Sequence, residues 1–128
     1  KFQSKMFSRT DQISTLIKDF KAPSNSNRVH IREGKLLVKE GGQYIERYCF
    51  LFNDLMVVTR ELKRVNSTES LSYGCLKVFL LKHGLVLDAR MEGKYYPFKI
   101  LCMSKADRNS FTFYTLSLLD KHSWMDEL

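Results

Sequence analysis

The sequence predicts a mainly β fold, in which about seven short antiparallel strands form a barrel or sandwich that a C-terminal α-helix caps. Three observations predict this fold class. Short segments rich in Val, Phe, Tyr and Thr recur along the middle of the chain, with turn residues between them. The last of these segments is followed by a helix-capping pattern and an apolar helical face. Another helical face stands before a linker near the N-terminus and predicts an extra N-terminal helix.

The middle of the chain consists of strand-like segments. The stretch RYCFLFNDLMVVTR, residues 47–60, has two apolar runs around the polar pair Asn53-Asp54. Each run is too short for a helix and suits a pleated surface, so the stretch predicts a hairpin. Gly41-Gly42 separates two further runs and can take the positive φ angles of a tight turn. The expected strands are 32–40, 44–52, 55–60, 73–81, 84–89, 95–103 and 111–116.

A helix is expected over residues 8–21, where apolar side chains share one helical face: Ile13, Leu16, Ile17 and Phe20. The breaker-rich segment 22–27, APSNSN, follows and predicts a flexible linker. A single amphipathic helix before a linker has no partner of its own. We therefore interpret it as a flap on the strands or as the severed end of a neighbouring domain. In either case we expect it to dock only weakly.

A second helix is expected at the C-terminus. Residues 117–120 read SLLD, an S-x-x-D pattern in which the hydroxyl accepts from an orphan amide and the acid favours the positive helix end. Leu118, Met125 and Leu128 form the apolar stripe of the helix that follows, with Trp124 beside it. Because an indole buries a large area in one residue, we expect Trp124 to plug the open end of the barrel.

Length and composition indicate one soluble domain. A chain of 128 residues is long enough for one core and too short for two. Its 44% apolar and 27% charged content is typical of a globular protein. No run approaches the ~20 apolar residues of a membrane span, and no signal-peptide pattern opens the chain. The cysteines are odd in number and strand-borne, which predicts buried, reduced thiols and a cytoplasmic location: Cys49, Cys75 and Cys102.

The formal net charge of +7 makes a nucleic-acid or membrane partner the first hypothesis, so its distribution matters. Residues 1–32 carry seven Lys or Arg against two Asp, whereas residues 33–103 carry eleven against eight acids. Most of the excess therefore lies in the N-terminal segment. A nucleic-acid surface needs clustered basic and aromatic side chains on one exposed face, but the aromatics here alternate inward. We expect no nucleic-acid binding.

No pattern in the sequence indicates an enzyme. His30, His83 and His122 are scattered without an i,i+4 partner, which favours surface or packing roles over metal binding. There is no G-x-S-x-G nucleophile motif, no G-x-G-x-x-G pattern and no phosphate loop. We therefore expect no catalytic residue, no metal and no cofactor.

Three motifs, taken in order, resemble those of pleckstrin homology (PH) domains, whose architecture is seven strands with a capping C-terminal helix. Residues 32–37, REGKLL, are similar to the family's first-strand opening, and residues 47–51, RYCFL, to its R-W-F-x-L second strand. Trp124 stands where the family keeps a helix tryptophan. The resemblance implies structural roles for Trp124, Gly34 and Phe50.

A narrower resemblance concerns residues 50–57, FLFNDLMV. This run is similar to the turn between the second and third strands of PH domains that follow Dbl-homology (DH) domains in Rho-family guanine nucleotide exchange factors. In that family the last helix of the exchange domain runs into the PH domain. The resemblance thus places a PH domain at 28–128 and the end of an exchange domain, with its linker, at 1–27. The implied partners are the adjacent DH domain and a Rho-family GTPase, and we expect a monomer.

The lipid-binding motif of the PH family is eroded in this sequence. The lysine expected four residues after the first-strand glycine is replaced by Val38, and the [K/R]-x-R pair falls on Ile45 and Arg47. Lys39 stands beside the lost lysine, but a shift of one residue along a strand turns a side chain to the opposite face. The resemblance therefore implies weak phosphoinositide binding without a headgroup pocket.

Weak attraction to an anionic membrane surface remains as an expectation. Acidic residues stand among the basic ones and offset much of that attraction: Glu33, Glu40, Glu46 and Glu61. The basic residues expected to contribute are Lys35, Lys39, Arg47, Arg60, Lys63 and Arg64.

The sequence thus predicts a non-catalytic signalling module of a Rho-type exchange factor. It would regulate or position the exchange domain through protein contacts and weak anionic-membrane binding, in the cytoplasm with peripheral membrane recruitment. One alternative is an autonomous phosphoinositide- or membrane-targeting adaptor PH domain. Another is a phosphotyrosine-binding-like fold that adds a peptide strand to an open sheet edge.

Overall fold

A computed structural model describes residues 9–22, 25–62, 72–103 and 108–128 of the chain. Every strand that the sequence predicts is present, and the mainly β fold class with a C-terminal helix is confirmed. The elements are α1 (Arg9–Leu16), β1 (Ile17–Lys18), β2 (His30–Glu40), β3 (Gln43–Phe52), β4 (Leu55–Leu62), β5 (Ser72–Leu80), the 3₁₀ helix η2 (Leu81–His83), β6 (Gly84–Asp88), β7 (Tyr96–Met103), β8 (Arg108–Thr115) and α2 (Leu118–Glu127).

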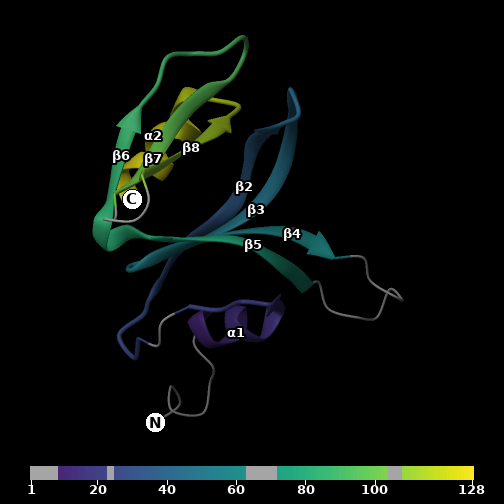
Figure 1. The fold of residues 1–128 in the computed structure, drawn as a ribbon, viewed down its shortest axis with the longest axis vertical. Helices are drawn as coiled ribbons and strands as arrows, with labels where there is room; N and C mark the ends of the chain where they lie inside the picture. Colours follow the sequence, from purple (N-terminus) through teal and green to yellow (C-terminus); the bar gives the residue numbers. More distant parts are fainter. Residues whose placement is uncertain (1–8, 23–24, 63–71, 104–107) are drawn as a thin grey trace.

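The strands form one eight-stranded sheet in the order β1-β5-β4-β3-β2-β8-β7-β6. Among the described residues, β2 pairs with β3 over most of its length but with β8 only between Leu37 and Tyr114. The sheet therefore bends at β2 and divides into two halves, β2–β5 and β6–β8. Figure 1 shows β4 and β5 crossing below the half that contains β6, β7 and β8, with α2 packed behind β7 and β8.

The sheet departs from the expected barrel in two respects. It does not close, because β1 and β6 stand at its two ends. It also contains an eighth strand of two residues, β1, in which Ile17 pairs with Tyr73 of β5 in parallel. The chain therefore leaves the helix at Leu16 rather than continuing to Phe20, and Asp19 then turns it with a positive φ of 63°.

Apolar side chains form two cores on opposite faces of β3 and β4. The first core lies between the two halves of the sheet and α2: Leu36, Val38, Cys49, Leu51, Met56, Val58, Phe79, Phe98, Ile100, Phe113 and Trp124. The second core lies under α1: Ile13, Ile17, Phe50, Phe52, Leu55, Val57 and Tyr73. Successive strand residues point to opposite faces, so both faces of β3 and β4 are buried. This explains why their sequences are continuous apolar runs rather than alternating ones.

Helix α2 covers one end of the first core. Ser117 caps it as expected, because its Oγ accepts a hydrogen bond of 3.1 Å from the backbone N of Asp120. Trp124 is 1% exposed, and a Cβ built on Gly34 would lie 3.5 Å from its Cζ2, in ordinary contact. Leu118, which the sequence placed on the inner stripe, is 49% exposed. It is the first residue of α2, whereas the buried residues of that helix are Lys121 and Trp124, further along it.

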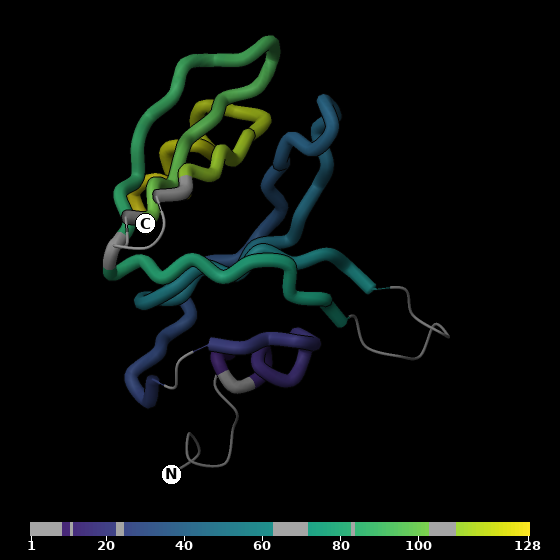
Figure 2. The backbone as a smooth tube through the Cα atoms, viewed as in Figure 1, coloured from purple at the N-terminus to yellow at the C-terminus, as the bar shows by residue number. Residues whose placement is uncertain are grey.

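Helix α1 packs on the outer face of the sheet. Ile13 is 0% exposed and Ile17 is 5% exposed, and both contact the second core. Figure 2 shows the backbone of α1 lying below β5 before the chain returns to the start of β2. Helix α1 finds a packing partner because β3 and β4 present a second apolar face, which includes Phe50 and Val57. The strength of this docking stays a prediction.

Candidate functional site

Glu33 of β2 joins the first turn of α1 to the sheet. Arg9 donates two hydrogen bonds to its carboxylate, from Nε to Oε1 over 2.8 Å and from Nη2 to Oε2 over 2.6 Å. The hydroxyl of Tyr48 donates to Oε2 over 2.8 Å. Burial on its own would raise the pKa of Glu33, but the hydrogen bonds from Arg9 and Tyr48 outweigh burial and lower it. The carboxylate therefore stays charged and holds α1 in a bidentate contact.

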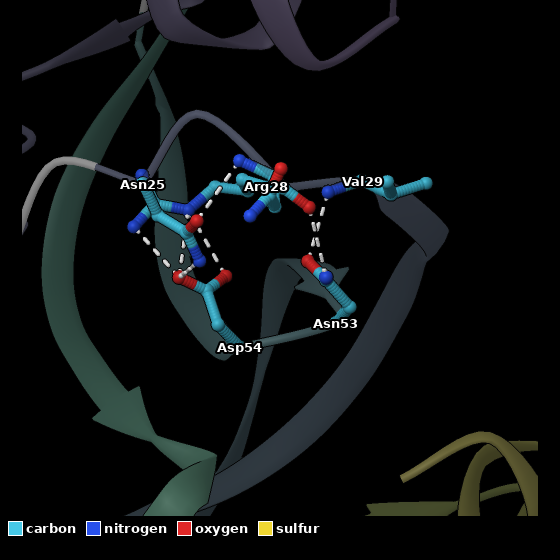
Figure 3. A network of polar contacts seen from close by, with 6 residues as sticks. Asn25, Arg28, Val29, Asn53 and Asp54 are labelled. Atoms are coloured by element: carbon cyan, nitrogen blue, oxygen red, sulfur yellow. Dashed lines mark hydrogen bonds and ion pairs between the residues drawn. The ribbon is translucent and has the colours of Figure 1, made fainter.

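The turn between β3 and β4 holds the linker that follows α1 (Figure 3). Arg28 Nε lies 3.0 Å from both carboxylate oxygens of Asp54, and Arg28 Nη2 lies 2.8 Å from Oδ2. Asn25 Nδ2 donates to the same Oδ2 over 3.0 Å. The side chain of Arg28 is only 12% exposed, so much of this pair is removed from solvent. The hydrogen bonds from Arg28 are the main reason that the pKa of Asp54 is lowered.

Asn53 binds the backbone of the linker. Its Oδ1 accepts from the backbone N of Val29 over 2.8 Å, and its Nδ2 donates to the carbonyl of Asn27 over 3.0 Å. Its own backbone N donates to the carbonyl of Val29 over 3.0 Å. The sequence marked Asn53 and Asp54 only as a turn. We call Asn25, Arg28, Asn53 and Asp54 together the linker clamp.

The basic residues that the sequence assigned to lipid binding do not form one pocket. In the β2–β3 register Leu36 pairs with Arg47, and Lys39 pairs with Tyr44. Cross-strand partners share a face and successive residues alternate, so Lys39 and Arg47 project from opposite faces of the hairpin. Val38, at the position where the lipid-binding motif has a lysine, is 2% exposed and belongs to the first core.

Three of these basic side chains already have carboxylate partners. The ion pairs are Lys35–Glu46 at 4.0 Å, Lys39–Glu92 at 2.9 Å and Arg47–Glu40 at 3.2 Å. Exposed pairs of this kind add little to stability, but each reduces the positive charge that a membrane would meet. Arg60 is exposed, whereas Lys63 and Arg64 lie outside the described residues.

Glu92 is the acidic residue that sequence reasoning missed. Besides its ion pair with Lys39, it accepts a short hydrogen bond from the hydroxyl of Tyr44 and one of 3.4 Å from the hydroxyl of Tyr114. The hydrogen bonds from Tyr44 and Lys39 lower its pKa. The ring of Tyr44 lies 4.3 Å from that of Tyr95 and 5.0 Å from that of Tyr114, measured between centroids. Lys39 therefore faces a fixed anion and a packed aromatic cluster rather than an empty anion site.

One depression near these residues has acidic side chains in its lining. It lies beside Lys35, has a volume of about 140 Å³ and is lined by two carboxylates, Glu46 and Glu61, together with Lys35, Arg47 and Tyr48. A site with that lining disfavours a phosphorylated headgroup. Among the described residues, no helix has the length and apolar character that crossing a membrane requires.

The described residues thus form a bent sheet that α2 caps, and α1 packs against the outer face of that sheet. The family model of the PH domain matches residues 30–128. The chain therefore belongs to the PH domain family. Comparison with curated protein sequences finds no match.

Solved structures of similar fold include DH/PH domains of Rho exchange factors. Those of PDZ-RhoGEF, in complex with GTP-γ-S activated RhoA, share 20% identity at a TM-score of 0.70, covering 92% of this chain and 37% of that chain. Those of p115-RhoGEF share 11% at 0.69, covering 93% and 38%. An activated truncation of Vav1 shares 18% at 0.66, covering 91% and 30%. These similarities show the fold, and the chain spans well under half of each neighbour.

Proposed function

We propose that this chain is the PH module of a Rho-type guanine nucleotide exchange factor, in which it positions and regulates a preceding DH domain. The observation that carries the proposal is the double attachment of the N-terminal segment to the sheet. Ile13 and Ile17 of that segment lie in the second core, and Asn25 and Arg28 bind the turn at Asp54. The DH/PH neighbours, among them complexes with RhoA, support the proposal through the shared fold.

The two attachments have different physical consequences. An apolar contact is non-directional and tolerates sliding, so the second core by itself leaves the direction of α1 loosely set. Charge-assisted hydrogen bonds are directional, and the contacts Arg9–Glu33 and Arg28–Asp54 each use two or more of them. In this proposal Arg9–Glu33 holds α1 against the PH domain at 28–128, and Arg28–Asp54 fixes the point where the linker enters that domain, so that the end of the exchange domain, at 1–27, is attached in one orientation.

The proposal assigns the exchange reaction to the preceding domain and its GTPase contact to the assembled DH/PH unit. The PH module acts without catalytic residues or a cofactor, as a monomer in the cytoplasm. Its own regulatory contribution is the fixed geometry of α1 and the linker clamp, together with protein contacts of the remaining surface.

Membrane binding is a secondary part of the proposal. We infer weak, non-selective attraction to anionic lipid, because Lys35, Lys39 and Arg47 are each ion-paired. The alternative, an autonomous phosphoinositide-targeting adaptor, needs a selective headgroup pocket. The same three ion pairs and the burial of Val38 argue against it.

Nucleotide exchange by a longer protein tests the main proposal. A protein extended upstream of Lys1 should accelerate nucleotide release from a Rho GTPase such as RhoA. Asp54→Ala removes the carboxylate that binds Asn25 and Arg28 and should change that rate severalfold. The matched control Asp126→Ala, on the exposed face of α2, should leave the rate unchanged. An upstream sequence that encodes no helical exchange domain would overturn the proposal. So would an unchanged rate when amide signals show that the linker of Asp54→Ala has detached.

Vesicle sedimentation tests the membrane part. Binding of the wild-type chain to anionic vesicles should be weak, should fall as salt rises, and should not distinguish phosphoinositide isomers. Glu92→Gln frees Lys39 and should strengthen binding about two- to fivefold, because one basic group near the surface contributes about 1 kcal/mol. Tight binding of one isomer that persists at high salt would favour the adaptor alternative instead.

A further inference from the structure

Strand β6 forms one edge of the sheet that the described residues build. It is last in the strand order and, among the described residues, pairs with β7 alone. An edge strand presents a row of unpaired backbone N–H and C=O groups. The opposite end of the sheet differs, because β1 from the N-terminal segment already extends β5. One edge of the sheet thus carries an added strand and the other remains available.

The side chains of β6 give this edge an apolar outer stripe. Leu85 and Leu87 are 52% and 42% exposed, and their spacing of two residues puts them on one face of the strand. Val86 between them packs against the first core, which fixes the strand's orientation. In the register with β7, Leu85 is opposite Leu101 and Leu87 is opposite Lys99. On this face, a strand added beside β6 would therefore contact the two leucines of β6, with an apolar and a basic side chain of β7 next to them.

Basic side chains without acidic partners surround the stripe. Lys82, Arg90 and Lys99 are exposed, and none of them forms an ion pair within the described part of the chain. The acidic residue of β6 itself, Asp88, is paired with the buried Lys121. By contrast, Lys35, Lys39 and Arg47 of β2 and β3 form ion pairs with carboxylates. Positive charge near β6 is therefore available to a partner, whereas the charge on those three side chains is already neutralised.

We propose that β6 binds an extended, acidic segment of a partner protein as an additional strand. The partner's backbone pairs with the open edge, its apolar side chains contact Leu85 and Leu87, and its acidic side chains pair with Lys82 and Lys99. A membrane surface would also suit leucines and lysines together. It would leave the edge backbone groups of β6 without partners in hydrocarbon, however, so the geometry favours a strand. This inference does not depend on the proposed function, because α1 and the linker clamp lie on the other half of the sheet.

A designed peptide tests the inference on the intact chain. The probe is a short fluorescent peptide of the sequence Thr-Val-Thr-Glu-Thr-Val-Thr-Glu, in which Val and Glu share one face of the strand, as Leu85, Leu87 and Lys99 do on β6 and β7. One control peptide has Lys in place of Glu, and another keeps the sequence of the probe but is N-methylated at alternate backbone amides. The acidic peptide should bind in fluorescence anisotropy and shift backbone amide signals of residues 84–88. The Lys peptide should not bind, and N-methylation should abolish binding because it removes the backbone donors.

Matched variants separate charge at this edge from charge in general. Lys82→Glu and Lys99→Glu should each weaken peptide binding about two- to fivefold, since an exposed ion pair contributes about 0.2–1 kcal/mol. Lys18→Glu, on the exposed side of β1, should leave binding unchanged. All three positions are exposed, so the thermal midpoints should stay close to that of the wild type.

Four outcomes would overturn the inference. Equal binding of the N-methylated peptide would show charge attraction without strand pairing. Amide shifts confined to other strands would place the site elsewhere, and no binding of the acidic peptide would remove it. If phosphatidylserine vesicles bind and lose binding on Lys99→Glu while the peptide does not bind, the edge is a membrane surface.

Discussion

The two helices are attached to the sheet in different ways. Helix α2 buries one large ring, that of Trp124, in the core between the two halves of the sheet. Helix α1 and the β1 strand after it bury two aliphatic side chains, Ile13 and Ile17, against a face of strands that are already paired, and charged contacts hold the first turn of α1 and the linker. The difference indicates that α2 mainly stabilises the fold, whereas α1 and the linker mainly set the direction of the N-terminal segment.

The largest expected effect is at α2. Trp124→Ala should lower the free energy of unfolding by about 3–5 kcal/mol, because it leaves a cavity in the first core. Chemical denaturation monitored by circular dichroism measures this change. Leu119→Ala, at a position that is 78% exposed on the same helix, is the matched control and should be close to neutral. A denaturant midpoint close to that of the wild type would show that α2 is not the main stabilising helix.

A smaller loss is expected at α1. Ile13→Ala should lower the free energy of unfolding by about 2–3 kcal/mol, near the low end for a buried aliphatic side chain, because the helix can shift to fill the space. Amide exchange should accelerate across residues 9–18 and much less across β7 and β8. Ser14→Ala, on the exposed face of α1, is the control. Uniform acceleration over the whole sheet would mean that both helices belong to one cooperative core.

The linker clamp should contribute less than either core. Asp54→Ala leaves the largely buried guanidinium of Arg28 without its carboxylate and should cost about 1–2 kcal/mol. Backbone amide signals of residues 25–29 should shift and lose protection from exchange, while those of α2 should not. Unaltered protection of the Val29 amide would mean that Asn53 alone holds the linker.

The smallest effect is the pH dependence of these contacts. The pKa values of Glu33 and Asp54 are lowered in the folded protein from ordinary values of 4.5 and 3.8. A lowered folded pKa contributes stability above the unfolded value, and that stability is lost as pH falls through the folded value. Acidification below about pH 4.5 should therefore destabilise the wild type more than Glu33→Gln/Asp54→Asn. Parallel curves of unfolding free energy against pH for the two proteins would contradict this.

Much of the fold could be predicted because its signals are local. The turn at Gly41-Gly42 has the expected positive φ angles of 58° and 80°, and Ser117 caps α2. The continuous apolar runs of β3 and β4 also contained a signal that sequence reasoning did not use. Runs without alternation indicate strands buried on both faces, and hence a cover such as α1 on the outer face.

The candidate site was less predictable, because its residues depend on partners that are distant in sequence. Lys39 was placed correctly on the face opposite Val38, since strand periodicity decides that. Its partner Glu92 is 53 positions away, on a loop whose position depends on how the sheet bends. The composition gives the number of basic residues but not which of them form ion pairs with carboxylates in the folded protein.

By itself, then, the sequence determined the positions of the strands along the chain and the capped C-terminal helix, which follow from periodicity, turn chemistry and residue type over a few positions. The resemblance to the PH family added the erosion of the lipid motif. Only the tertiary structure decided that α1 docks, that Arg28 meets Asp54 across 26 positions, and that β6 remains an open edge. These features arise when the sheet bends at β2 and brings remote side chains within hydrogen-bonding distance, and no local pattern encodes such a distance.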